Sequence, residues 1–145
     1  VATPAPTEAP TETPTEIPTQ VPTTVATDMP TSMPVVGADP ALIAQGVEVY
    51  RSRYCGICHS LTVANTRGTF APNHDHVATH AQEHLADPGY SGSATTVEEY
   101  LMESLLEPQR YFVPGYELSP HSMPTFSHLS DEELIALVAM LATQE

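Results

Sequence analysis

The chain has 145 residues and a formal net charge of −14, from 18 acidic residues against four arginines and no lysine. This acidic balance argues against a nucleic-acid-binding protein, since phosphates would repel it, and it suits an encounter with a basic protein partner. No run of about 18 apolar residues occurs, so we expect no segment that spans a bilayer.

The N-terminal part of the chain has a composition that cannot build a hydrophobic core. From Pro6 to Val25 the sequence repeats in fours, as PTEA, PTET, PTEI, PTQV and PTTV. The proline in every unit fixes φ and removes a backbone donor, which disfavours helix and sheet and favours polyproline II. We therefore expect residues 1–38 to be an extended tether or docking segment, and Val1 looks like a processed terminus. Residues 39–145 are enough for one small domain.

Helix signals begin directly after this segment. Asp39 is an N-cap followed by Pro40 at the first helical position, and apolar residues recur at helical spacing from there to Tyr54. A second helix is predicted from His76 to Ala86.

Two further helices carry capping boxes. The third begins at Thr96, with Glu99 as its box partner, and ends before Pro108. The last begins at Ser130, with Glu133 as its box partner, and has an apolar face. No hairpin signal is evident, so we expect an all-α domain with long loops.

Residues 55–59 read CGICH, the attachment pattern of a c-type haem. Two thiols three positions apart on one turn can form thioethers to the two vinyl groups on one porphyrin edge. We therefore expect Cys55 and Cys58 to hold one covalent haem c and His59 to ligate its iron. A thioredoxin-like redox pair is the first alternative, but no βαβ pattern surrounds the motif. Half of a zinc site is the second, and only histidines could complete it.

The second axial ligand must come from far along the chain. Of the five methionines, two lie in the N-terminal segment and two inside predicted helices, where methionine more often fills the core. Met123 instead lies in an irregular loop before the last helix, and Pro124 stiffens the backbone beside it. We expect Met123 to be the ligand, with His121 as its competitor. His/Met ligation fills both axial positions, which favours electron transfer over catalysis.

Two other residues are expected near the haem. The second ring nitrogen of His59 needs an acceptor, and the carbonyl of Pro72, thirteen residues on, is well placed to provide it. Arg67 is a candidate partner for a haem propionate, and its alternative interpretation is a solvated surface arginine.

Four histidines fall within eleven residues, at positions 74, 76, 80 and 84. His76, His80 and His84 share one face of the predicted second helix, and such spacing can bind Zn²⁺ or Cu²⁺. A solvated or partner-facing helix is the alternative that we favour, because no obvious further ligand other than Asp75 or Glu83 completes the set.

Together these features resemble the class I cytochrome c family. The matching residues run in order over about 40–145: Gly46 and Tyr50, the CxxCH motif, Pro72, Met123-Pro124 and the C-terminal helix 130–143. The resemblance implies about four helices around one covalently attached haem, with the first helix packed closely against the face from Leu137 to Leu141. The family usually has Gly-Pro-x-Leu after the haem motif, whereas this chain has Ala71-Pro72-Asn73-His74.

A finer resemblance covers residues 96–124, which are similar to cytochrome c domains that work with terminal oxidases. They also resemble the monohaem subunit of alternative complex III. That resemblance implies a periplasmic or extracytoplasmic, membrane-associated subunit with an N-terminal lipid anchor. It would pass electrons from a quinol-oxidising respiratory or photosynthetic complex to a soluble redox protein.

Two other functions stay open from the sequence. The first is a stand-alone carrier, soluble or lipid-tethered, that serves a terminal oxidase or reaction centre. The second is a haem-based sensor or peroxidase-like enzyme, which needs an open axial position.

Overall fold

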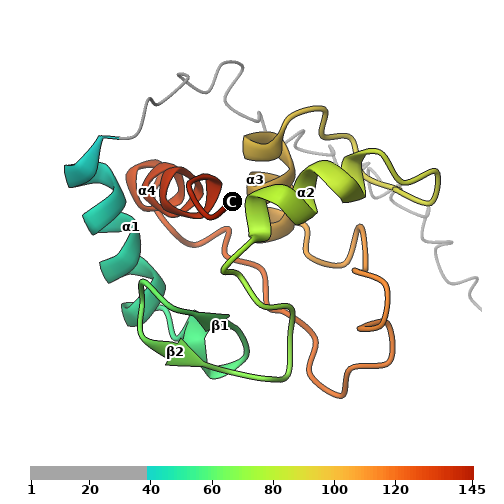
Figure 1. The fold of residues 1–145 in the computed structure, drawn as a ribbon, viewed down its shortest axis with the longest axis horizontal. Coiled ribbons are helices and arrows are strands. Elements are labelled where there is room, and N and C mark those ends of the chain that lie inside the picture. The colour runs from blue at the N-terminus through green and yellow to red at the C-terminus, as the bar shows by residue number, and fades with distance from the viewer. Residues whose placement is uncertain (1–38) are drawn as a thin grey trace, which may run out of the picture. The chain divides into compact units, whose positions relative to one another are not determined.

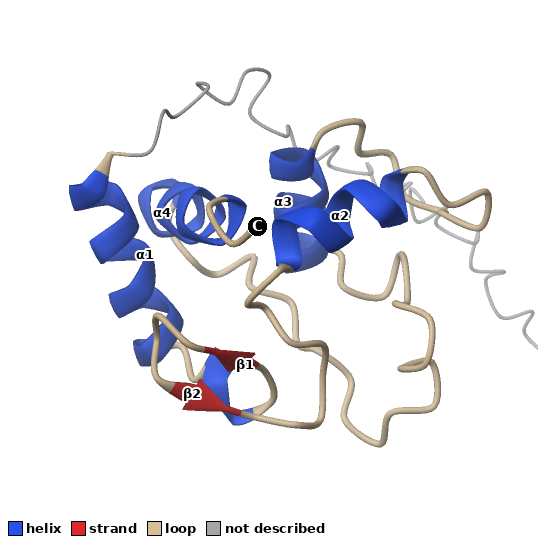
Figure 2. Ribbon diagram, in the orientation of Figure 1, coloured by secondary structure: helices blue, strands red, loops and turns tan. Residues whose placement is uncertain are grey.

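A computed structural model describes residues 39–145, and the predicted tether, residues 1–38, lies outside the described residues. The described part is helix-rich, which confirms the expected all-α class (Figures 1 and 2). Its elements in chain order are α1 (Pro40–Ser52), a turn of 3₁₀ helix η1 (Cys55–Ile57), β1 (Ser60–Leu61), β2 (Thr66–Arg67), α2 (Val77–Leu85), α3 (Val97–Leu106) and α4 (Asp131–Ala142).

The predicted helix starts are confirmed where a cap was expected. The Asp39 carboxylate accepts a hydrogen bond from the Ala41 amide at 2.9 Å, so α1 begins at Pro40. Both capping boxes, at the starts of α3 and α4, are formed in full, because each cap side chain and its glutamate partner bond reciprocally. In α2 the capping residue His76 makes no side-chain cap hydrogen bond.

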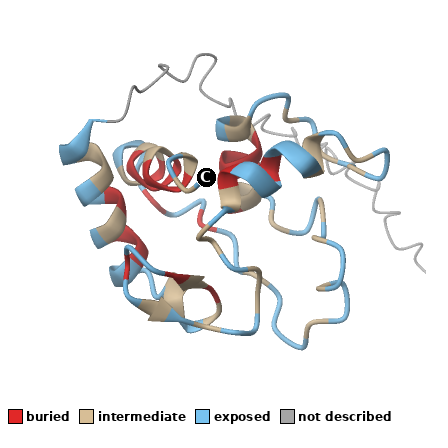
Figure 3. Cartoon of the chain, in the orientation of Figure 1, coloured by how far each residue is buried: buried red, intermediate tan, exposed pale blue. Residues whose placement is uncertain are grey.

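The core lies where α4 packs against α1 and α3, with α2 beside α3 (Figures 1 and 3). Leu137, Val138 and Met140 on α4 and Tyr50 on α1 are almost wholly removed from solvent. A Cβ on Gly46 would clash with the backbone oxygen of Ala136 and the Cβ of Met140. The expected close crossing of the first and last helices is therefore present at Gly46.

Two local predictions need correction. The first helix ends at Ser52, and Tyr54 does not continue its apolar face: it adopts a left-handed conformation with φ 59° and is 72% exposed. At this residue the chain leaves the direction of α1 and enters the short 3₁₀ turn that contains the CGICH motif. The strands β1 and β2 pair as a short antiparallel hairpin, which we did not predict. Its strands are too short for a visible alternation, and the only local sign is Asn65, a residue type that tolerates its φ of 53°.

A buried carboxylate anchors the loop that connects α2 to α3. Glu103 accepts hydrogen bonds from the Tyr90 hydroxyl at 2.5 Å and from the amide and hydroxyl of Ser93, both at 2.8 Å. The Nε atom of Arg110 lies 3.8 Å from the carboxylate of Glu103. Burial by itself raises the pKa of Glu103, but these hydrogen bonds and the arginine charge outweigh it and leave the pKa lowered.

We expect Glu103→Gln to destabilise the domain at neutral pH and to matter less in acid. A carboxyl with a lowered folded-state pKa contributes stability above its unfolded pKa, and that contribution is lost as pH falls through the folded value. At pH 7 the loss should be about 1–3 kcal/mol, the usual cost of disrupting a buried polar partner. Urea unfolding at pH 7 and pH 3 measures both values, with exposed Glu98→Gln as control. If the difference in unfolding free energy between the wild type and Glu103→Gln were the same at pH 7 and pH 3, this account would be contradicted.

Candidate haem site

The CGICH motif forms a compact turn directly after α1. The amide of His59 donates to the Cys55 carbonyl at 3.0 Å, which closes one turn around the two thiols. Both cysteines are unbridged and half-buried. Burial raises the pKa of Cys55 to about 11, so this thiol is neutral at pH 7. A reactive CxxC redox pair needs a lowered thiol pKa, which argues against the thioredoxin-like alternative.

The His59 side chain is buried and held at one ring nitrogen. Its Nδ1 lies 2.7 Å from the carbonyl oxygen of Pro72, the hydrogen bond that the sequence predicted. Because a carbonyl can only accept, Nδ1 carries the proton and the lone pair of Nε2 is left for a metal. Burial lowers the pKa of His59, and the Pro72 bond opposes this only in part. The ring is therefore kept neutral, as ligation requires.

The unpredicted hairpin and the segment after it hold the motif backbone. The Thr66 hydroxyl and the Gly68 amide donate to the His59 carbonyl at 3.1 and 3.3 Å. The amides of Phe70 and Ala71 both donate to the Cys58 carbonyl at 3.1 Å. Gly68 approaches so closely that a Cβ there would overlap the backbone of Cys58 and His59. A larger residue at 68 would push this support away from the motif.

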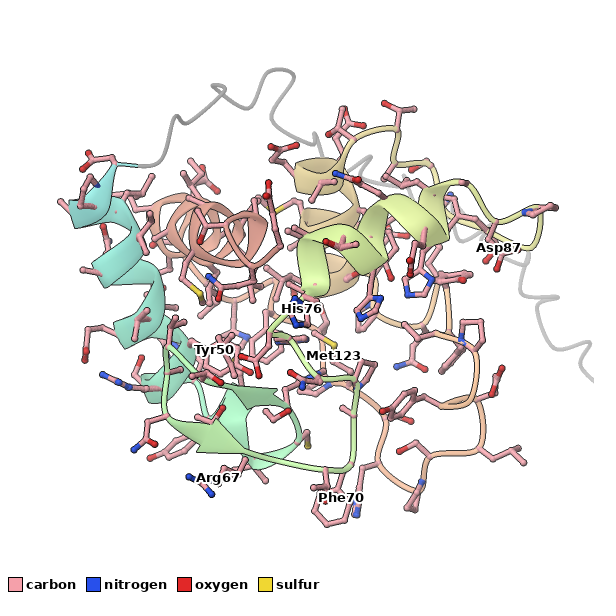
Figure 4. All side chains as sticks on the ribbon, viewed as in Figure 1. Tyr50, Arg67, Phe70, His76, Asp87 and Met123 are labelled. Carbon is pink, nitrogen blue, oxygen red and sulfur yellow. The ribbon has the colours of Figure 1, made fainter. Side chains whose placement is uncertain are left out.

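Met123 lies half-buried in a loop that is tied to the end of α3. The Gln109 side-chain amide donates to the Met123 carbonyl at 3.1 Å, and the Thr125 hydroxyl donates to the Leu106 carbonyl at 2.9 Å. The methionine packs against the hydrophobic core. It also lines a hollow of about 430 Å³, together with Thr125 and residues 106–110. Figure 4 labels its position.

His121, the competing ligand, has a different environment. Its ring is exposed and meets the edge of Phe70, with the ring centroids 5.0 Å apart. The neighbouring Ser119 hydroxyl donates to the Phe70 carbonyl at 3.3 Å, which holds this stretch at the surface. Of the two candidates, only Met123 packs on the core, and this favours it as the inward-facing ligand.

Arg67 is exposed on β2 and points away from the domain (Figure 4). It forms no ion pair with any acid in residues 39–145. Its position matches the surface-arginine interpretation, and its proposed contact with a propionate remains a prediction.

The three histidines at the start of α2 and within it have separate hydrogen-bond partners. His80 pairs with Glu83 at 3.0 Å, His76 meets the Glu145 carbonyl at 2.7 Å, and His84 lies 3.4 Å from the Tyr111 hydroxyl. Within residues 39–145 no three His, Cys, Asp or Glu side chains are placed to hold a metal ion together. The i, i+4 spacing of these histidines therefore gains no support as a zinc or copper site.

His74 falls into the same group as those histidines by sequence spacing, but its side chain has different neighbours in the structure. His74 precedes α2, and its ring stacks on that of His59 with centroids 3.8 Å apart and an interplanar angle of 21°. Its Nδ1 lies 3.2 Å from the Tyr50 hydroxyl. The signal available in the sequence was the departure from Gly-Pro-x-Leu in Ala71-Pro72-Asn73-His74.

The donor set fits haem c. It comprises two free thiols in one turn, a neutral imidazole with Nε2 available, and a half-buried thioether on a restrained loop. A haem iron takes only two axial ligands from the protein, so a cluster of three metal-binding side chains is not needed.

Comparisons with protein-family models, with curated proteins and with solved structures find no match to this chain. None of the helices in the described part is long and apolar enough to cross a membrane.

Proposed function

We propose that this chain is a class I cytochrome c domain that binds one covalent haem c and transfers single electrons. The observation that carries the proposal is the setting of His59: it completes CGICH, is buried and neutral, and donates from Nδ1 to Pro72 at 2.7 Å. A thioredoxin-like pair has no need of a histidine presented in this way. When bound, a His/Met-ligated haem supplies a one-electron couple with both axial positions filled.

Each site residue has a defined task in this proposal. Cys55 and Cys58 anchor the cofactor at one edge, and His59 offers Nε2 while Pro72 fixes its tautomer. Met123 offers the thioether, whose loop is restrained through Gln109. Hydrogen bonds already hold the His59 ring and the Met123 backbone, which limits the rearrangement needed when the oxidation state changes.

Haem attachment is tested by expressing the full chain with c-type haem maturation. We expect the pyridine haemochrome spectrum of one haem c per chain, which stays with the protein in denaturant because the bonds are covalent. The double variant Cys55→Ser/Cys58→Ser should release any haem into acidified solvent. Haem that resists extraction from the double variant, or a wild type that binds none, would contradict the proposal.

We further propose that the protein works as a membrane-associated, extracytoplasmic subunit of a quinol-oxidising complex and passes electrons to a soluble acceptor. Residues 96–124 support this through their resemblance to the monohaem subunit of alternative complex III, and the acidic charge suits a basic partner. Size-exclusion chromatography of mildly solubilised native membranes tests it. Elution of this haem with large multihaem partners is expected, whereas elution near the chain's own mass would favour a stand-alone or lipid-tethered carrier.

A further inference from the structure

The proposed iron ligand His59 forms a cluster with two side chains from other segments, His74 and Tyr50. The His74 ring lies parallel to His59, with centroids 3.8 Å apart, and the Tyr50 hydroxyl of α1 lies 3.2 Å from His74 Nδ1. The His74 backbone is also fixed, because its amide donates to the Ser60 carbonyl at 2.9 Å. Tyr50 is 1% exposed, so its hydroxyl needs a hydrogen-bond partner inside the protein, and His74 provides one.

The bond to Pro72 does not fully orient His59. A hydrogen bond at Nδ1 selects the tautomer and holds one ring atom, but the ring can still tilt about that point. A flat neighbour packed against one face of the ring opposes the tilt over the whole ring.

We propose that His74 is a positioning residue that sets the plane of the His59 imidazole, and that Tyr50 in turn holds His74. This inference rests on the proposed haem function and deepens it. In a bound ferric haem, the orientation of the ligating imidazole plane would set the π overlap between the imidazole and the iron d orbitals. His74 therefore influences the electronic anisotropy and the reduction potential of the centre without touching the iron. The leucine usual at this position in the resembling family offers neither a flat face nor a hydrogen bond to Tyr50.

Three variants of the haem-loaded full chain test this inference. His74→Leu removes both the stacked ring and the hydrogen bond, and Tyr50→Phe removes only the hydrogen bond. His80→Leu is the matched control, since His80 is an exposed histidine paired with Glu83 on α2. The readouts are the low-temperature ferric EPR g values, the spread of the haem methyl NMR shifts, and the reduction potential.

We expect His74→Leu to shift the g values and the methyl spread clearly and to change the potential. Tyr50→Phe should produce a smaller shift in the same direction, and His80→Leu none. A merely structural role would lower the unfolding midpoint and leave the g values in place. That pattern would overturn the inference, as would equal shifts in His74→Leu and His80→Leu.

The covalent haem content of each variant separates this inference from the function on which it rests. A fully loaded His74→Leu protein with unchanged g values overturns the positioning role and leaves the haem proposal standing. A wild type without covalent haem overturns both.

Discussion

Met123→Ala is expected to convert a closed low-spin haem into one with an open coordination position. The variant should bind carbon monoxide readily in the ferrous state, whereas the wild type should not. Loss of the thioether should also lower the reduction potential on the order of 0.1 V, a part of the about 0.8 V over which axial ligands set haem potentials. Optical spectra with and without carbon monoxide, followed by a redox titration, measure both effects.

His121→Ala is the matched control for this prediction. His121 is exposed and packs on Phe70, so its removal should leave the spectrum and the carbon monoxide response unchanged. The reverse pattern, an unaffected Met123→Ala and an altered His121→Ala, would make His121 the ligand. A wild type that already binds carbon monoxide or cyanide would favour the sensor or peroxidase-like alternative.

Gly46→Ala is expected to destabilise the domain by about 1–3 kcal/mol, the usual range for overpacking a well-packed site. On an exposed helix the same change would stabilise by roughly 1 kcal/mol, because alanine has the higher helix propensity. The sign reverses here because the new Cβ would meet the backbone oxygen of Ala136 and the Cβ of Met140. Helix α4 would have to move off α1, and the core that they share would open.

Chemical denaturation of the haem-loaded protein measures this effect. The calibrating variant is Ala44→Gly at an exposed position of the same helix, which should cost only about 0.5–1 kcal/mol through propensity. A Gly46→Ala protein as stable as the wild type, or more stable, would show that α1 and α4 do not approach each other closely at this point.

Local signals allowed much of the helical framework to be predicted. The cap at Asp39 and the capping boxes at Thr96 and Ser130 use hydrogen bonds between residues two or three positions apart. These helix starts can therefore be predicted from a few neighbouring residues of the sequence. The same locality explains one error. The apolar spacing of the first helix continues to Tyr54, but the turn into the CGICH motif ends the helix at Ser52.

The candidate site also has features that the sequence predicts and features that only the structure shows. The CGICH letters alone predict a haem attachment turn, and a proline thirteen residues on was enough to anticipate the acceptor for His59. The hairpin that supports the turn was not anticipated, because its strands are too short to show a period. The need for Gly68 becomes visible only when its backbone lies against Cys58.

Sequence spacing assigned His74 to the wrong group. By position it belongs with His76, His80 and His84, and only the folded chain places it against His59 and Tyr50. The sequence by itself determined the Cys-Cys-His pattern on which the proposed attachment rests and the starts of the capped helices, because both depend on residues a few positions apart. Tertiary structure decided which histidine stacks on the proposed ligand and whether Met123 or His121 packs inward. Those choices depend on contacts across fifteen or more residues, which form only when the core brings distant segments together.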